Sequence, residues 1–163
     1  MNLGSTSTFL LRLSLLTTLL TAIMVASAQS PAKPDANDVP AASQMQPEEL
    51  VQAIKTGGAQ KPVVLYVGPK AFYTQAHIPG ADFIGPVAQP EGMEKLRARA
   101  ASLAKDGPVV IYCGCCPWDH CPNIRPAFAE LKKMGFTRVR VLYLANSFGV
   151  NWAEKGFPVA KGE

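Results

Sequence analysis

The sequence predicts an α/β protein with a mainly parallel sheet covered by helices on both faces. Short apolar, β-branched runs alternate along the chain with segments whose apolar residues recur at helical spacing. The connections between them are short, as strand–helix–strand units require. The chain has 163 residues, of which 48% are hydrophobic and 17% charged, as in an ordinary globular protein. This composition excludes collagen-like, coiled-coil and wholly disordered classes.

Residues 1–28 have the layout of a secretory signal peptide. Arg12 carries the only side-chain charge in this segment, residues 13–25 are apolar or small, and Ala26-Ser27-Ala28 forms a small-x-small cleavage site. The apolar run is shorter than the roughly 20 residues that span a bilayer. We therefore expect export to the periplasm or outside the cell, with no membrane attachment after cleavage. An uncleaved N-terminal anchor is the alternative.

Residues 29–45 are expected to form a flexible linker. This stretch contains Pro31, Pro34 and Pro40 and lacks aromatic, leucine and isoleucine residues. Such a composition buries too little apolar area to offset the entropy of ordering. The folded domain is then residues 46–163, which is enough chain for one hydrophobic core.

The expected elements follow in order along this domain. Runs rich in apolar and β-branched residues predict strands at residues 62–67, 82–84, 108–112 and 138–143. Apolar residues at helical spacing predict helices at residues 47–55, 92–105 and 124–134. The first and third strands lack alternation, which is typical of strands covered on both faces.

A loop at residues 113–122 connects the third strand to the last helix. Asn123 is a favourable N-cap, and Pro126 is then tolerated in the first turn of the helix, where amide groups have no intrahelical partner. Ligands of parallel α/β sheets usually bind beyond the carboxyl ends of strands, where this loop begins. The loop is therefore the expected site.

All four cysteines of the chain lie in this loop, as Cys113, Cys115, Cys116 and Cys121. A thiolate is favoured near the amino terminus of a helix, so we expect the pKa of Cys113 to be lowered. The net charge of +4, from 16 basic and 12 acidic residues, is scattered along the chain. No basic stripe with interleaved aromatic residues is present, so a nucleic-acid partner is not expected.

Four segments in order give the chain a resemblance to the rhodanese-like domain family. Residues 76–81 read A-H-I-P-G-A, and an apolar strand runs directly into Cys113. Residues 131–136 read L-K-K-M-G-F, and Trp152 precedes G-F-P-V at residues 156–159. The resemblance implies a three-layer sandwich with a central five-stranded, mainly parallel sheet. It also implies a sulfur-carrying cysteine that cycles between thiol and persulfide, and by position this is Cys113.

The resemblance implies a sulfurtransferase that takes sulfur from thiosulfate or another sulfane-sulfur donor and passes it to a thiol acceptor. A protein thiol is a further candidate partner, and no cofactor is expected. The expected catalytic residues are Cys113 and Cys116, the expected substrate-binding residues are Gly114, Cys115 and Arg125, and Cys121 and His120 are candidate resolving groups or ligands. Nine residues separate Cys113 from Asn123, so the loop is longer than the compact substrate cradle of the family's sulfurtransferases.

Three alternatives to sulfur transfer remain open from the residues alone. The fold can be catalytically silent and hold copper or zinc through the loop, with Cys113, Cys115, Cys116, Cys121 and His120 as ligands. Cys113 and Cys116 form a C-x-x-C pair suited to thiol–disulfide exchange. Ordinary structural disulfides are the third alternative, since an exported protein meets an oxidising environment.

Overall fold

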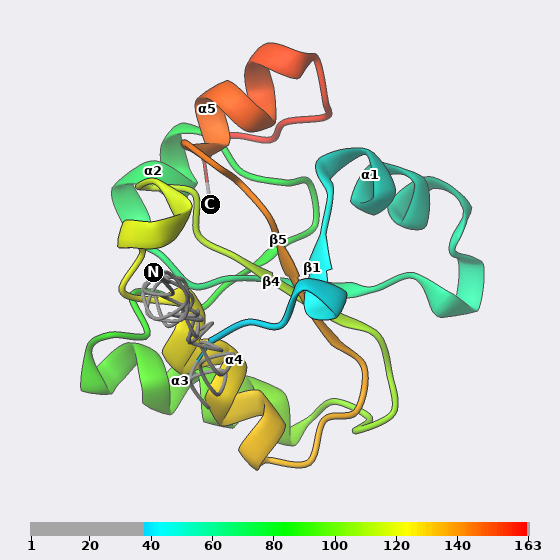
Figure 1. Ribbon diagram of the computed structural model, residues 1–163, viewed down its shortest axis with the longest axis vertical. Helices are drawn as coiled ribbons and strands as arrows, with labels where there is room; N and C mark the ends of the chain where they lie inside the picture. Colours follow the sequence, from blue (N-terminus) through cyan, green and yellow to red (C-terminus); the bar gives the residue numbers. More distant parts are fainter. Residues whose placement is uncertain (1–37, 163) are drawn as a thin grey trace, which may run out of the picture. The chain divides into compact units, whose positions relative to one another are not determined.

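The computed structural model describes residues 38–162 (Figure 1). The predicted signal peptide and residues 29–37 of the predicted linker lie outside this range. The described part contains no helix with the length and apolar character needed to cross a membrane.

Five parallel strands form one sheet in the order β1-β5-β4-β2-β3. They are β1 (Gln44–Met45), β2 (Val63–Tyr66), β3 (Asp82–Phe83), β4 (Val109–Tyr112) and β5 (Val139–Leu142). Every residue of β4 is buried, as its lack of alternation predicts for a central strand. Tyr66 of β2 pairs with Tyr112 of β4, so these two strands end at the same level.

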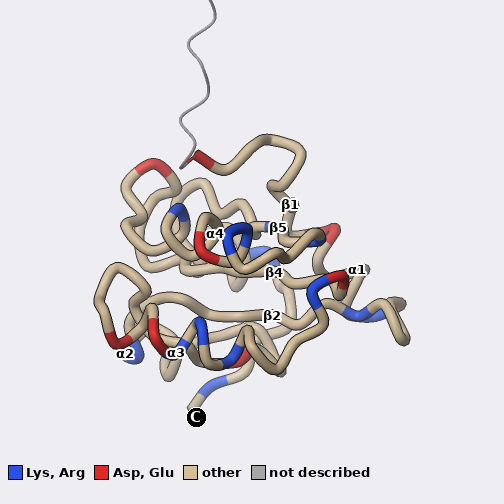
Figure 2. The backbone as a smooth tube through the Cα atoms, turned by 90° about the horizontal axis from the view of Figure 1, so that it is seen from below, with Lys and Arg blue, Asp and Glu red and all other residues tan. Residues whose placement is uncertain are grey.

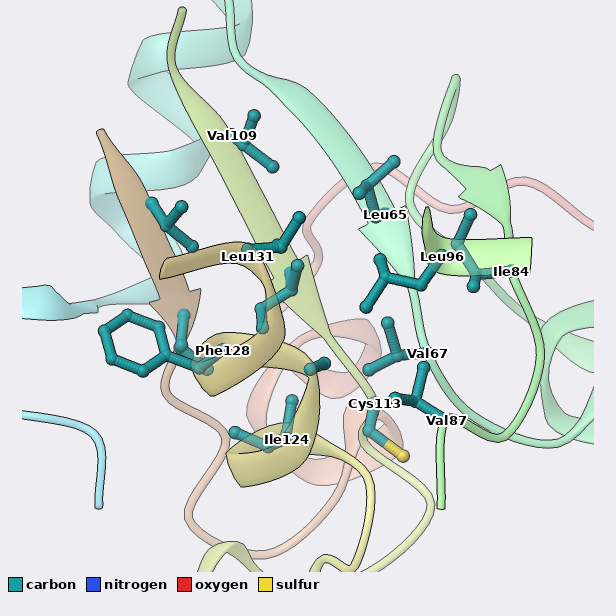
Figure 3. Packing of buried hydrophobic residues seen from close by; sticks show 14 of the residues in the cluster. Leu65, Val67, Ile84, Val87, Leu96, Val109, Cys113, Ile124, Phe128 and Leu131 are labelled. Carbon is teal, nitrogen blue, oxygen red and sulfur yellow. The ribbon is translucent and has the colours of Figure 1, made fainter. Parts of the chain in front are cut away.

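One face of the sheet is covered by α3 (Pro90–Ala101) and α4 (Ile124–Lys133), which lie next to each other in Figure 1. Alternate strand residues such as Leu65 and Ile111 point to this face and pack against Leu96 of α3 and Leu131 of α4. Figure 3 shows this packing, with Cys113 at the end of β4. The same cluster of buried residues therefore includes the first cysteine of the loop.

The opposite face is covered by α1 (Pro47–Thr56), α2 (Lys70–Gln75) and α5 (Phe148–Asn151). The other strand residues, among them Val64 and Val110, pack here with Leu50 of α1 and with Trp152. Helices on both faces make three layers, and the predicted α/β sandwich with a five-stranded parallel sheet is confirmed. Short 3₁₀ turns occupy Ala41–Ser43, Gly58–Gln60, Trp118–His120 and Ala153–Lys155.

The last residues assigned to the flexible linker belong to the sheet. Gln44 and Met45 pair with β5, and Val39 and Met45 are buried. This edge strand is stabilised by pairing with β5 and by burial of Met45, and neither feature is visible in local composition. The folded unit therefore begins before Gln46.

The helices differ from expectation mainly in their bounds. Helix α3 begins at Pro90 instead of residue 92, because proline is well suited to the first helical turn. It ends at Ala101 instead of residue 105. After Ala101 the amides of Ser102 and Leu103 donate to the carbonyl oxygens three residues earlier, which tightens the last turn. The short helices α2 and α5 have no counterpart among the predicted elements.

Charged side chains are interspersed over the surface of the described residues. Helices α1, α3 and α4 each carry both acidic and basic residues (Figure 2). Four of the ion pairs among the described residues join side chains far apart in sequence: Arg97 with Glu130, Arg99 with Asp82, Arg125 with Asp38, and Arg140 with Glu49. Such pairs connect elements that are neighbours in the fold.

Candidate functional site

Cys113 lies directly beyond the carboxyl end of β4, where the sequence predicts the site. Its side chain is only 2% exposed, and Figure 3 shows it beside Val67 and Val87. Gly68 makes room for the sulfur, because a Cβ atom on Gly68 would lie 2.8 Å from Cys113 Sγ. Local sequence does not indicate this role of Gly68, since the close approach depends on the pairing of β2 with β4.

Gly114 turns the chain sharply after Cys113. Its φ of 77° lies in the left-handed region that favours glycine. A Cβ atom here would lie 2.7 Å from Phe148 Cβ and 2.9 Å from Leu144 Cδ1, and the Gly114 carbonyl accepts a hydrogen bond from the Phe148 amide. Gly114 therefore joins the cysteine loop to the start of α5.

The turn brings the thiols of the loop together. Cys113 Sγ lies 3.2 Å from Cys115 Sγ, and Cys115 Sγ lies 3.4 Å from Cys116 Sγ. All four cysteines are free thiols. The immediate neighbour of Cys113 is thus Cys115, which lies between Cys113 and the Cys116 of the predicted C-x-x-C pair.

Asn123 has a different role from the predicted N-cap. Helix α4 begins at Ile124 as predicted, but Asn123 has a helical backbone and its side chain caps no amide of the helix. The side chain is buried, and its Oδ1 accepts a hydrogen bond of 3.0 Å from the Ala88 amide. The amide nitrogen Nδ2 therefore faces Cys113 and donates to Sγ at 3.6 Å.

The amides at the start of α4 stabilise Cys121 instead of Cys113. A hydrogen bond from Cys113, helped by the backbone amides of Asn123 and Ile124 and opposed by burial, lowers the pKa of Cys121 to about 6. The hydrogen bond to Cys121, together with burial, raises the pKa of Cys113. The expectation of a lowered Cys113 pKa is therefore corrected: the pKa of Cys113 is raised, and the pKa that is lowered is that of Cys121.

Cys116 has the opposite character to Cys121. Burial, followed by its hydrogen bond with Cys115, raises the pKa of Cys116 to about 12. Its sulfur also donates to the carbonyl oxygen of His120 at 3.8 Å. Cys116 is therefore a neutral thiol around neutral pH, which is unfavourable for a nucleophile.

A pocket of about 600 Å³ opens onto the first two cysteines. Its walls come from four segments that are distant in sequence. The lining residues are Tyr66, Phe72, Gln75, Ala76, Cys113, Gly114, Cys115, Ser147, Phe148, Gly149, Ala153, Val159 and Lys161. Among the described residues of this lining, Lys161 alone is charged.

The chain after Pro158 returns to the pocket through an antiparallel bridge. The amide and carbonyl of Ala160 bond to the carbonyl and amide of His77, at 2.9 Å each. This bridge places Val159 and Lys161 in the lining of the pocket, together with Phe72 of α2. Phe72 and Val159 are 48% and 37% exposed, so the rim of the pocket is partly apolar.

Four of the predicted site residues lie outside this pocket, namely Cys116, His120, Cys121 and Arg125. Arg125 Nη1 donates to the carbonyl oxygen of Trp118 at 3.3 Å, and its Nε lies 3.4 Å from Asp38 Oδ1. The guanidinium group thus connects the loop to the N-terminal segment and does not line the cavity. The His120 side chain is exposed, and the loop around it is anchored by Trp118, which packs against Tyr143 and bonds to Ala145.

The geometry gives no support to the metal-binding alternative. Within residues 38–162, no three side chains of histidine, cysteine, aspartate or glutamate are arranged to enclose a metal ion. The exposed position of His120 removes the only imidazole of the proposed ligand set from the buried thiols. Cys113, Cys115 and Cys116 instead form a line of neighbouring thiols, and the first two of them open onto the pocket.

The fold and site together define an α/β protein with a buried cysteine at the end of a central parallel strand. A family model described as the rhodanese-like domain matches residues 46–148, which is more than half of the chain. The chain therefore belongs to the rhodanese-like domain family. No curated protein matches the chain significantly.

Solved structures share this fold at low sequence identity. The Alr3790 protein from Anabaena sp. has 20% identity and a TM-score of 0.55, with coverage of 72% of this chain and 92% of the other. The BH2092 protein from Bacillus halodurans has 24% identity and a TM-score of 0.56, with coverage of 72% and 76%. A thiosulfate sulfurtransferase from Pseudomonas aeruginosa has 23% identity and a TM-score of 0.53, over 74% of this chain and 20% of that one.

Proposed function

We propose that this protein transfers sulfane sulfur through a persulfide on Cys113. The observation that carries the proposal is the position of Cys113 Sγ, which lines a 600 Å³ pocket and receives a hydrogen bond from Asn123 Nδ2. Membership of the rhodanese-like family supports the same chemistry. Thiosulfate or an organic persulfide is the donor, and a small or protein thiol is the acceptor.

The step that loads Cys113 begins with a proton transfer. Attack requires Cys113 to lose its proton, and the neighbouring Cys121 sulfur is the proposed acceptor. The Cys113 thiolate then attacks the sulfane sulfur of the donor, and the donor's S–S bond breaks. The bonding electrons leave with the rest of the donor, as sulfite from thiosulfate or as a thiolate from an organic persulfide. Asn123 Nδ2 is placed to donate to the resulting persulfide.

The location of the activity is also part of the proposal. The layout of residues 1–28 supports export to the periplasm or outside the cell. Purified exported protein is expected to begin at Gln29, as N-terminal sequencing would detect. A protein that retains Met1 would contradict cleavage.

A single-turnover experiment with the reduced chain tests the assignment of Cys113. The protein is mixed with an equal amount of thiosulfate or glutathione persulfide, and the released sulfite or thiol is quantified. The unaltered chain and the matched control Cys116→Ser are expected to release about one equivalent, and Cys113→Ser none. Full release by Cys113→Ser would refute the proposal.

A further inference from the structure

Cys115 differs from Cys116 and Cys121 in its position relative to the pocket. Only Cys113 and Cys115 among the described cysteines line the pocket. Their sulfurs are in direct contact at 3.2 Å, and the left-handed turn at Gly114 makes this contact between nearby residues possible. The thiol of Cys115 is therefore adjacent to any sulfur that is attached to Cys113.

The distance between the two sulfurs determines which reaction Cys115 can perform. Displacement at sulfur requires the attacking, central and leaving sulfurs to lie nearly in line. Attack on the outer sulfur of a Cys113 persulfide would need Cys115 beyond that atom, more than 5 Å from Cys113 Sγ, because the S–S bond alone is about 2.05 Å. At 3.2 Å, Cys115 Sγ is instead placed to attack Cys113 Sγ itself.

We infer that Cys115 discharges the persulfide of Cys113 as sulfide and leaves a Cys113–Cys115 disulfide. In this step the bond between Cys113 Sγ and the outer sulfur breaks, and a bond between the two cysteine sulfurs forms. The outer sulfur leaves as HS⁻ and takes with it the bonding electrons and the thiol proton of Cys115. The sulfane sulfur is reduced to sulfide, and the two cysteines are oxidised to a disulfide, so the step needs no other oxidant. This inference rests on the proposed function.

An external dithiol returns the pair to its starting state. Cys115 is half-buried whereas Cys113 is buried, so the reductant attacks the sulfur of Cys115. The Cys113 thiolate that leaves receives the hydrogen bond of Asn123 Nδ2. The dithiol is thereby oxidised to its own disulfide, and one reductant molecule is consumed for each sulfide released.

The test measures sulfide release in the absence of added thiol. Reduced protein, freed of reductant, is mixed with one equivalent of thiosulfate, and both sulfide and intact mass are followed. Thiosulfate is the donor because its other product, sulfite, is distinguishable from sulfide. The unaltered chain is expected to release about one sulfide and to yield a disulfide that maps to Cys113 and Cys115.

Cys115→Ser and the matched variant Cys116→Ser separate the two neighbours. Cys115→Ser is expected to keep the added sulfur on Cys113 and to release at least about tenfold less sulfide. Cys116→Ser removes the thiol that contacts Cys115 on the side away from Cys113. This variant is expected to release as much sulfide as the unaltered chain. Sulfur retained on Cys113 of Cys115→Ser also shows that the variant is folded and competent.

Two results would overturn the inference alone. One is undiminished sulfide release by Cys115→Ser that carries a Cys113 persulfide, and the other is a disulfide that maps to Cys113 and Cys121. If no variant released sulfite from thiosulfate, the proposed function would fail together with the inference. Release of sulfite thus distinguishes failure of the proposed sulfur transfer through Cys113 from failure of the discharge by Cys115.

Discussion

Cys121 is the residue at which burial and hydrogen bonding oppose each other most clearly in the site. Burial disfavours its thiolate, but the Cys113 thiol and two backbone amides at the start of α4 favour it and dominate. The same hydrogen bond, together with burial, raises the pKa of Cys113, which the family resemblance selects as the nucleophile. The two thiols are therefore shifted in opposite directions.

The shifted pKa values of Cys121 and Cys113 predict how the stability of the protein depends on pH. Between pH about 6 and the ordinary thiol pKa of about 8.5, Cys121 is a thiolate in the native state and a thiol in the unfolded chain. The unfolded state then binds more protons, so this contribution to the free energy of unfolding increases as pH rises through that window. It is lost as pH falls through about 6. Above about 8.5, the raised pKa of Cys113 acts in the opposite direction.

Urea unfolding under reducing conditions, from about pH 5.5 to about pH 8.5, measures this contribution. Cys121→Ser has no ionisable group at this position, so it should lose the increase that the unaltered chain shows. Cys116→Ser is the matched control, because the pKa of Cys116 lies at about 12 and the residue stays neutral in this range. Parallel pH profiles for the unaltered chain and Cys121→Ser would contradict the prediction.

The sequence predicts the position of a site residue correctly when that position follows from the end of a strand. It fails when the position depends on the direction of a side chain. Cys113 was placed beyond β4 because an apolar run ends at Tyr112. Arg125 lies near the helix start, as predicted, but its guanidinium group points to Trp118 and Asp38. Asn123 faces Cys113 because the Ala88 amide, 35 residues earlier, occupies its oxygen. Local sequence contains no signal for such a long-range partner.

At the level of elements, the cysteine loop and α5 depend on each other. Gly114 is the point of contact, since its missing side chain leaves space for Phe148 and Leu144. The loop therefore owes its shape to a helix that begins more than 30 residues later. Periodicity could not predict α5, which has only four residues and begins at the side-chain cap formed by Ser147.

Gly114→Ala is expected to destabilise the protein through two separate effects. The positive φ costs about 1–3 kcal/mol for a residue with a side chain. The new methyl group also collides with Phe148 and Leu144, which adds about 1–3 kcal/mol of overpacking. Urea unfolding gives the total.

Gly135→Ala provides the matched control for this substitution. Gly135 has a φ of 88°, and a Cβ atom there would meet nothing within 4 Å. It therefore has the conformational cost without the collision. Equal destabilisation by the two substitutions would show that the packing of Gly114 against α5 contributes nothing.

Most of the predicted strands and helices are long and apolar, and the exception is the two-residue strand β3, predicted at residues 82–84. Val63–Tyr66, Val109–Tyr112 and Val139–Leu142 form the centre of the sheet and have strong local signals. Strand β1 and helix α2 were missed, because they are short and depend on partners elsewhere in the fold. The line of thiols was also beyond prediction, because the sequence gives the spacing of the cysteines but not the turn that brings Cys113 onto Cys115.

In the molecule as a whole, segments from both halves of the described chain meet around the pocket. The carboxyl ends of β2 and β4 coincide, and α2, α5 and the segment near Ala160 surround them. The rim carries exposed Phe72 and Val159 together with one charge, that of Lys161. Under the proposed function, the charge of Lys161 would attract an anionic donor such as thiosulfate.

Lys161→Gln is expected to weaken the binding of an anionic donor. The KM for thiosulfate should rise about threefold or more with little change in kcat, because the lost attraction acts equally on the bound donor and the transition state. The difference between the variant and the unaltered chain should shrink as salt screens the charge. Lys155→Gln is the matched control, since Lys155 is exposed and does not line the pocket. An unchanged KM in Lys161→Gln would contradict the role of this charge.

The 3.2 Å contact between Cys113 and Cys115 also has a consequence for the lifetime of the protein. An oxidant that reaches Cys113 first produces a sulfenic acid, and a second oxidation to sulfinic acid is irreversible in most settings. With a thiol already in contact, the sulfenic acid condenses to a disulfide and releases water before a second oxidant arrives. Damage is thus converted into a form that a dithiol repairs.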